Sequence, residues 1–142
     1  MALPTHFRLE FVTPERTIVH DDVDEVVLPG EEGDFGVLPG HAPMLALLRI
    51  GPMWYRKGAD KVFAFVAGGV AEVVGDRVTV LAQVAERAED IDLARAEAAK
   101  HRAEQVVAKP PTDMDYELAR VALLRAVTRL EVSKHARTRN RS

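Results

Sequence analysis

The chain has 142 residues, a formal net charge of −3 and no cysteine; 47% of its residues are hydrophobic and 29% are charged. This composition is typical of a folded domain, and the lack of cysteine excludes a disulfide framework, a thiolate zinc site and a cysteine nucleophile. We expect neither a membrane-spanning helix, which needs roughly 20 apolar residues, nor a secretory signal, which needs a basic and then an apolar segment.

The first 84 residues have the pattern of an all-β domain. Phe7, Leu9 and Phe11 alternate with charged residues, as in a half-buried strand. Further strands are expected at about 23–28, 44–48, 53–56, 61–67, 70–74 and 77–81. Turn signals separate these runs, including the Gly33 to Pro43 loop, Gly51-Pro52, Gly68-Gly69 and the hairpin turn Gly75-Asp76. Short strands at this spacing favour a sandwich or a barrel.

From about Ala85 the pattern becomes helical. Asp90 is expected to cap a first helix that begins at Ile91, because its carboxylate can accept from exposed amides of the first turn. Alanine dominates this helix, and Lys109-Pro110-Pro111 is expected to end it, since proline lacks an amide donor. The sequence thus predicts a β-domain over residues 1–85 and a helical segment over 86–142, with a basic tail from about residue 134.

A second helix is predicted after the two prolines. Thr112 to Asp115 resembles a capping box with aspartate in the usual place of glutamate, and the helix should run to about Lys134. Its apolar stripe at three-four spacing consists of Tyr116, Ala119, Leu123, Ala126 or Val127, and Leu130. The two helices should form an antiparallel hairpin that is too small to fold alone and therefore docks on the β-domain or on another protein.

Charge is distributed unequally along the chain. Residues 1–84 carry 7 basic and 12 acidic side chains, giving −5, whereas residues 85–142 carry 12 basic and 10 acidic side chains, giving +2. The second part therefore suits an acidic partner or a phosphate group, although a solvated helix face would have the same composition.

Arginines gather on both predicted helices. Asp92, Arg95 and Arg102 share one face of the first helix, and Arg125 and Arg129 are four residues apart on the second. In an antiparallel hairpin these faces can converge, and clustered guanidinium groups favour a bound phosphate. The alternative is ordinary pairing within each helix, of Asp92 with Arg95 and of Glu97 or Glu104 with Arg102.

Motifs for catalysis are absent from the sequence. Asp34 and His41 could take part in acid–base chemistry, but no serine precedes Ser133 and no nucleophile elbow occurs. The chain has no phosphate-binding loop of the Gly-x4-Gly-Lys-Ser/Thr type, so it is not expected to hydrolyse ATP by itself. No metal site is predicted, and no basic segment carries the interleaved aromatic residues of a nucleic-acid groove.

Five sequence blocks in order give the chain a family resemblance. They are residues 9–16, the Gly33 to Pro43 block with Pro39-Gly40-His41-Ala42-Pro43, residues 65–73 around Gly68-Gly69, residues 78–82, and Ile91-Asp92-x-x-Arg95-Ala96. Together they resemble the epsilon subunit of the F-type rotary ATP synthase, of bacterial type. The resemblance covers the chain from Phe7 to about Ala136.

The resemblance implies a ten-stranded β-sandwich followed by a two-helix hairpin, in a non-catalytic subunit of the central stalk. Implied partners are the gamma subunit, the c subunits of the membrane rotor ring and, when the hairpin extends, the alpha and beta catalytic subunits. The complex would lie on the cytoplasmic face of the bacterial inner membrane, with this chain as a peripheral subunit. Asp34 and His41 match the loop that faces the ring.

No cofactor is required by the resemblance, but ATP is implied as a possible regulatory ligand of the folded hairpin. The residues that match this site are Glu86, Asp92, Arg95, Arg102, Arg125 and Arg129. Two other interpretations remain: a free-standing β-sandwich binding module whose basic helical tail recognises an acidic protein, and a nucleotide-hydrolysing enzyme.

Overall fold

The computed structural model describes residues 4–136, and most of the predicted basic tail, residues 137–142, lies outside the described residues. The strands come first and the helices follow. The strands are β1 (Phe7–Val12), β2 (Thr17–Val23), β3 (Glu25–Gly30), β4 (Gly33–Val37), β5 (Met44–Lys57), β6 (Asp60–Val74) and β7 (Arg77–Arg87). A 3-10 turn, η1 (Ala88–Asp90), then leads to α1 (Leu93–Ala108) and α2 (Asp113–Ser133).

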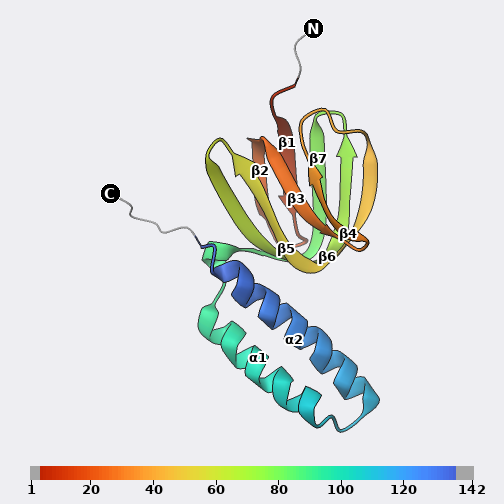
Figure 1. The fold of residues 1–142 in the computed structure, drawn as a ribbon, viewed down its shortest axis with the longest axis vertical. Coiled ribbons are helices and arrows are strands. Elements are labelled where there is room, and N and C mark those ends of the chain that lie inside the picture. The colour runs from red at the N-terminus through yellow and green to blue at the C-terminus, as the bar shows by residue number, and fades with distance from the viewer. Residues whose placement is uncertain (1–3, 137–142) are drawn as a thin grey trace, which may run out of the picture.

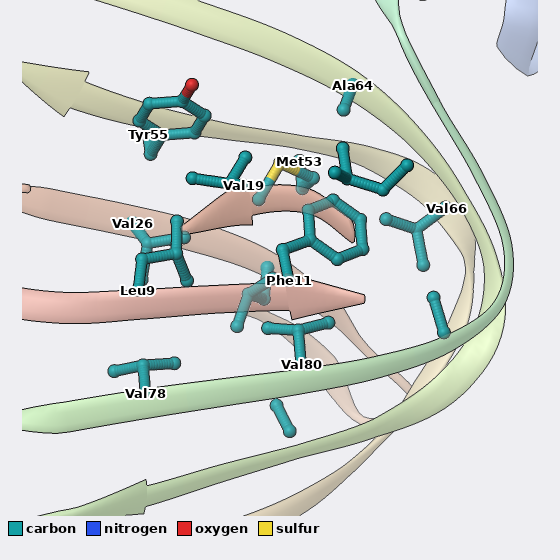
Figure 2. Close-up of a cluster of buried hydrophobic side chains, with 14 of the residues drawn as sticks. Leu9, Phe11, Val19, Val26, Met53, Tyr55, Ala64, Val66, Val78 and Val80 are labelled. Carbon is teal, nitrogen blue, oxygen red and sulfur yellow. The ribbon is translucent and has the colours of Figure 1, made fainter. Parts of the chain in front are cut away.

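The strands form a sheet in the order β2-β1-β7-β6-β5-β3-β4. All neighbouring pairs are antiparallel except β1 and β7, which are parallel. The sheet curves over itself, so that its strands surround one apolar interior (Figure 1). Figure 2 shows this core, in which Leu9 and Phe11 of β1 lie opposite side chains of β5 and β6 such as Met53 and Val66.

The predicted sandwich followed by two helices is confirmed, with seven strands rather than ten in residues 4–136. One reason is that two predicted turns lie inside strands. Gly51-Pro52 belongs to β5, and Gly68-Gly69 belongs to β6, which pairs with both β5 and β7 on either side of this point. Gly68 and Gly69 have φ values of 76° and 141°, so the strand bends there without ending.

Two further strands were not expected from the sequence. β2 buries Ile18, Val19 and Val23, but this pattern does not alternate and charged residues interrupt it, so the sequence does not mark the strand. β4 includes the first half of the segment predicted as a loop, so Asp34 lies on a strand and His41 on the loop that follows. The predicted hairpin turn at Gly75-Asp76 is confirmed, because Val74 pairs with Arg77 across it.

The two helices form the predicted antiparallel hairpin (Figure 1). The first helix begins later than predicted, because Ala88–Asp90 forms a 3-10 turn and Asp92, rather than Asp90, is the cap. The second helix is capped as predicted: the Thr112 hydroxyl accepts from the amide of Asp115 at 3.0 Å. Of the predicted stripe on α2, the alanines are buried, Leu123 and Leu130 are half-buried, and Tyr116 and Val127 are exposed.

The hairpin extends from one end of the sandwich and contacts it mainly through the C-terminal part of α2 (Figure 1). A second apolar cluster, separate from the main core, forms this contact; we call it the junction cluster. Its buried members are Phe65, Ala67, Ala88, Ile91 and Val132, with Ile50, Phe63 and Val84 packed against them. Docking of the hairpin on the sandwich therefore depends on few apolar side chains.

Candidate functional site

A cleft of about 560 Å³ lies where the sandwich meets the hairpin. This volume is within the range of roughly 300–1,000 Å³ that is usual for small-molecule sites. The turn between β1 and β2, strand β7 and both helices line it. The lining residues are Thr13, Glu15, Arg16, Gln83, Val84, Ala85, Glu86, Asp92, Arg95, Ala96, Ala99, Arg102 and Arg129.

Helix α1 places two free cations along the cleft. Arg95 and Arg102 are seven residues apart, so they lie on the same face of the helix, and the small residues Ala96 and Ala99 separate them. Both arginines are exposed, and neither has an ion-pair partner within residues 4–136. The expected alternative of pairing with Glu97 or Glu104 is therefore not found for Arg102 in this part of the chain.

Asp92 has a structural role at the beginning of α1. One of its carboxylate oxygens accepts from the amide of Arg95 at 3.0 Å, which satisfies a donor that the helix leaves unpaired. The Asp92 side chain therefore meets the backbone of Arg95 rather than its guanidinium group. Because the same residue lines the cleft, its remaining acceptor capacity faces any ligand bound there.

Arg129 reaches the cleft from α2 and is held on two sides. Its Nε donates to Glu86 of β7, and its guanidinium lies 4.4 Å from the centre of the Phe65 ring. The pair of Glu86 and Arg129 thus joins the sandwich to the hairpin at the edge of the junction cluster. Both side chains are partly buried, which strengthens a charged contact relative to one in open solvent.

Arg125 is the one predicted ligand residue that the cleft does not include. It lies one turn before Arg129 on α2 and is half-buried. Its Nε is buried and has no hydrogen-bond partner within the described residues. A buried donor without a partner is costly, so a change in the hairpin or an added acceptor would stabilise this side chain.

The charges in the cleft favour an anion. Four arginines and three carboxylates line it. Glu86 is already used by Arg129, and Asp92 accepts at the start of α1. The third carboxylate, Glu15, is exposed on the β1–β2 turn, and neither α1 guanidinium group has an ion-pair partner among residues 4–136. Guanidinium groups bind phosphate oxygens through paired, charge-assisted hydrogen bonds, so the residues present fit a phosphorylated ligand.

The Asp34 and His41 region lies on another part of the sandwich. Asp34 forms an ion pair with Arg49 of β5, while Nδ1 of His41 is 2.6 Å from the carbonyl oxygen of Ala42. The two side chains therefore have separate partners and do not form the acid–base pair that their spacing first suggested. Exposed Leu38 lies on the same loop as His41, and exposed Leu45 and Leu47 line the same surface depression as Asp34, so this region is apolar as well as polar.

Sequence reasoning did not find the part of the cleft that the sandwich contributes. Thr13, Arg16 and Gln83 line it, yet Arg16 is more than seventy residues before Asp92 in the chain. No local pattern marks these residues as site residues. Only the parallel pairing of β1 with β7 brings the β1–β2 turn next to Glu86 and the start of α1.

Both parts of the chain match known protein families. Residues 6–88 match the β-sandwich domain of the ATP synthase delta/epsilon chain, and residues 89–134 match the long α-helix domain of the same chain. The chain belongs to the ATP synthase delta/epsilon family. The six predicted ligand residues of this family member lie on both sides of the boundary, with Glu86 in the sandwich match and the other five in the helical match.

Individual relatives of the chain support this family assignment. The ATP synthase epsilon chain of Nitratidesulfovibrio vulgaris is 48% identical over 128 residues, which cover 90% of this chain and 96% of the relative. That of Syntrophobacter fumaroxidans is 46% identical over 127 residues, covering 89% of this chain and 95% of the relative. The matches thus include the sandwich, the hairpin and the cleft between them.

Solved structures share the fold of this family member. A chain in the Euglena gracilis mitochondrial ATP synthase, in a structure of OSCP, F1 and the c-ring, has a TM-score of 0.81 at 23% identity, covering 95% of this chain and 85% of that chain. A chain in the central stalk and c-ring structure from Tetrahymena thermophila has a TM-score of 0.60 at 12% identity, covering 94% and 99%. Within residues 4–136, neither helix has the length and apolar character needed to cross a membrane.

Proposed function

We propose that this chain is a central-stalk subunit of a proton-translocating ATP synthase and couples the rotor ring to the gamma subunit. The match of both its segments to the delta/epsilon family carries this proposal. The names of the relatives, each a chain of ATP synthase, agree with an accessory, non-catalytic role. The complex would hold the chain as a peripheral subunit at the cytoplasmic face of the bacterial inner membrane.

The surface formed by β4, the loop that carries His41 and the first residues of β5 is the proposed contact with the c subunits of the ring. Asp34 is exposed beside Arg49, and Leu45 and Leu47 are exposed on β5, the strand that carries Arg49. A surface that combines apolar side chains with a paired charge is suited to a partner surface of mixed character. The gamma subunit would bind another face of the sandwich, and the alpha and beta subunits would meet the hairpin only when it extends.

Replacement of residues on this surface tests the assembly. Asp34→Lys reverses the charge beside Arg49, and His41→Ala removes a loop side chain; both should leave the isolated fold intact because both residues lie outside the core. ATP-driven proton pumping in reconstituted membranes should decrease in both variants. Asp60→Asn, an exposed position at the end of β6 far from Leu45, is the matched control. Unchanged pumping in both variants would contradict a role of this surface in coupling.

Co-purification separates this function from its alternative. A tagged chain expressed in its own cells should bring down gamma and the ring in fixed ratio. A free-standing binding module whose basic helical segment recognises an acidic protein would instead be recovered without ring subunits. Recovery of that kind would overturn the proposed place in the stalk.

The cleft is the proposed site for ATP as a regulatory ligand. Arg95 and Arg102 would bind phosphate oxygens, and Asp92 would accept from a ribose hydroxyl or the base amine. Arg129, held by Glu86, would complete the site, and Arg125 would join it if its guanidinium turns toward the cleft. Bound ATP would favour the folded hairpin, because the cleft is formed by both helices and the sandwich together.

Calorimetry of the full chain with ATP tests this site. Removing one charge-assisted phosphate contact should weaken binding about tenfold to a hundredfold, so Arg95→Ala should raise the Kd by this factor. Arg120→Ala is the matched control, because Arg120 pairs with Glu117 on α2 and does not line the cleft. No heat with millimolar ATP, or equal affinity in wild type and Arg95→Ala, would contradict the nucleotide site.

A further inference from the structure

The sandwich supplies a cation of its own to the cleft. Arg16 lies on the turn between β1 and β2 and lines the cleft opposite α1, which carries Arg95 and Arg102. Arg16 comes from a part of the chain that holds none of the six predicted ligand residues. A ligand in the cleft would therefore lie between charged side chains of the sandwich and of the hairpin.

The turn that carries Arg16 is held firmly by Thr13. The amide of Thr13 donates to the carbonyl oxygen of Arg16 at 2.9 Å, and the Thr13 hydroxyl donates to the same oxygen at 3.2 Å. The hydroxyl also accepts from the amides of Glu15 at 3.3 Å and Arg16 at 3.2 Å. Because the backbone is fixed in this way, only the side-chain torsions of Arg16 have to be ordered when it binds a ligand.

Arg16 has only a loose partner within the described residues. Its Nη2 is 3.9 Å from a carboxylate oxygen of Asp90 in η1, which exceeds the usual hydrogen-bond distance, and both side chains are about half exposed, at 53% and 45%. The guanidinium donors of Arg16 thus remain available. By contrast, Arg8 on the neighbouring strand β1 is 3.2 Å from Asp22 and lies away from the cleft.

We propose that Arg16 is a direct phosphate contact of the ligand in this cleft, so that one anion bridges the sandwich and the hairpin. The inference rests on the proposed ATP site and adds a residue from the sandwich to it. Arg16 would bind the anion from one side while Arg95 and Arg102 bind it from the other. Bound ligand then ties the two parts together, and its affinity depends on the hairpin being folded against the β1–β2 turn.

Calorimetry of four full-length variants with ATP tests the proposal. Arg16→Gln should raise the Kd about tenfold, which is the lower end of the range for loss of a charge-assisted contact. Arg16→Lys, which keeps the charge but loses the paired donors, should restore part of the affinity. Arg8→Gln makes the same change of charge at a distance from the cleft and should leave the Kd unchanged.

Asp90→Asn separates a direct contact from an indirect one. If Arg16 acts only by holding Asp90 and the start of the hairpin, Asp90→Asn will weaken ATP binding as much as Arg16→Gln does, and the proposal is wrong. If Arg16 meets the phosphate, Asp90→Asn removes a competing carboxylate and will leave the affinity equal or higher. The rise in melting temperature caused by ATP should follow the same order of variants, because a ligand that binds only the folded state stabilises it.

The outcomes also separate this inference from the proposed function. ATP binding by the wild type with an unchanged Kd in Arg16→Gln overturns the role of Arg16 and leaves the nucleotide site standing. No binding by the wild type overturns both. Co-purification with gamma and the ring tests the place in the stalk independently of either result.

Discussion

At Gly69, both the backbone conformation and the surrounding space require a residue without a side chain. Its φ of 141° is one that other residues rarely adopt. A Cβ atom there would overlap the carbonyl oxygen of Leu81 and lie 2.8 Å from Cα of Ala82 on β7. The glycine thus lets β6 remain paired with β7 while the sheet bends.

Replacement of Gly69 by alanine should therefore destabilise the sandwich. We expect the free energy of unfolding of Gly69→Ala to fall by about 1–3 kcal/mol, the usual cost of a strained backbone conformation, or by more if β7 has to shift. Gly36→Ala is the control, since its added Cβ would make only an ordinary 3.6 Å contact with Val27. Urea unfolding measures both variants, and equal midpoints for the two would contradict this role of Gly69.

At the scale of elements, the last turns of α2 and the residues directly after it hold the hairpin to the sandwich. Val132 is buried in the junction cluster, Arg129 pairs with Glu86, and the ring of His135 stacks on Phe63 with centroids 3.9 Å apart. The main core, by contrast, is drawn entirely from the strands. A weakened junction should therefore release the helices before the strands unfold.

Val132→Ala should loosen this junction selectively. The change removes two buried methyl groups, which corresponds to about 1–2 kcal/mol of apolar burial. Amide hydrogen exchange should become faster in α1 and α2 while the rates in β5, β6 and β7 remain unchanged. Val127→Ala, at a position on the same helix that is 43% exposed, serves as the control. Equal acceleration in strands and helices would mean that the two parts unfold together.

The same elements show which features of the fold can be predicted from the sequence. The alternation of Phe7, Leu9 and Phe11, the tight turn at Gly75-Asp76 and the cap at Thr112 depend on neighbouring residues, and these were predicted. Strand continuity through Gly68-Gly69 depends instead on pairing with β5 and β7, which is not encoded locally. For this reason the strands were predicted to end where they only bend.

The residues of the candidate site also fall into two groups, those that neighbouring residues in the sequence predict and those that depend on strand pairing. Asp92, Arg95 and Arg102 belong to one local motif, and the structure brings them together with Glu86 and Arg129 in the cleft. Arg16 could not be predicted, because its place depends on the pairing of β1 with β7.

For the whole molecule, the two parts of the chain that meet at the cleft differ in formal charge. Residues 1–84 sum to −5 and residues 85–142 to +2. On the outer surface of α2, Glu117 lies 3.0 Å from Arg120, and its carboxylate raises the pKa of that guanidinium. An extended hairpin would present the arginines of α2, Arg120, Arg125 and Arg129, to acidic surfaces of the catalytic subunits.

Removal of the helical hairpin tests this arrangement in the assembled complex. A chain that ends after Asp90 keeps every member of the main core but loses Ile91 and Val132 from the junction cluster. We expect the sandwich to stay folded, with a lower melting temperature because Phe65 becomes exposed, and to assemble with gamma and the ring. ATP hydrolysis by the complex should then rise, since the arginines of α2, Arg120, Arg125 and Arg129, no longer reach the alpha and beta subunits.

The comparison requires complexes of equal subunit composition, with full-length and truncated chains assayed in parallel over a range of ATP concentrations. If bound ATP stabilises the folded hairpin, the difference between the two complexes should be largest at low ATP, where the full-length hairpin is free to extend, and should narrow as ATP rises. Equal rates at every ATP concentration would show that the hairpin does not inhibit hydrolysis. If the two rates differ by the same amount at every ATP concentration, the hairpin inhibits hydrolysis but ATP does not control this inhibition.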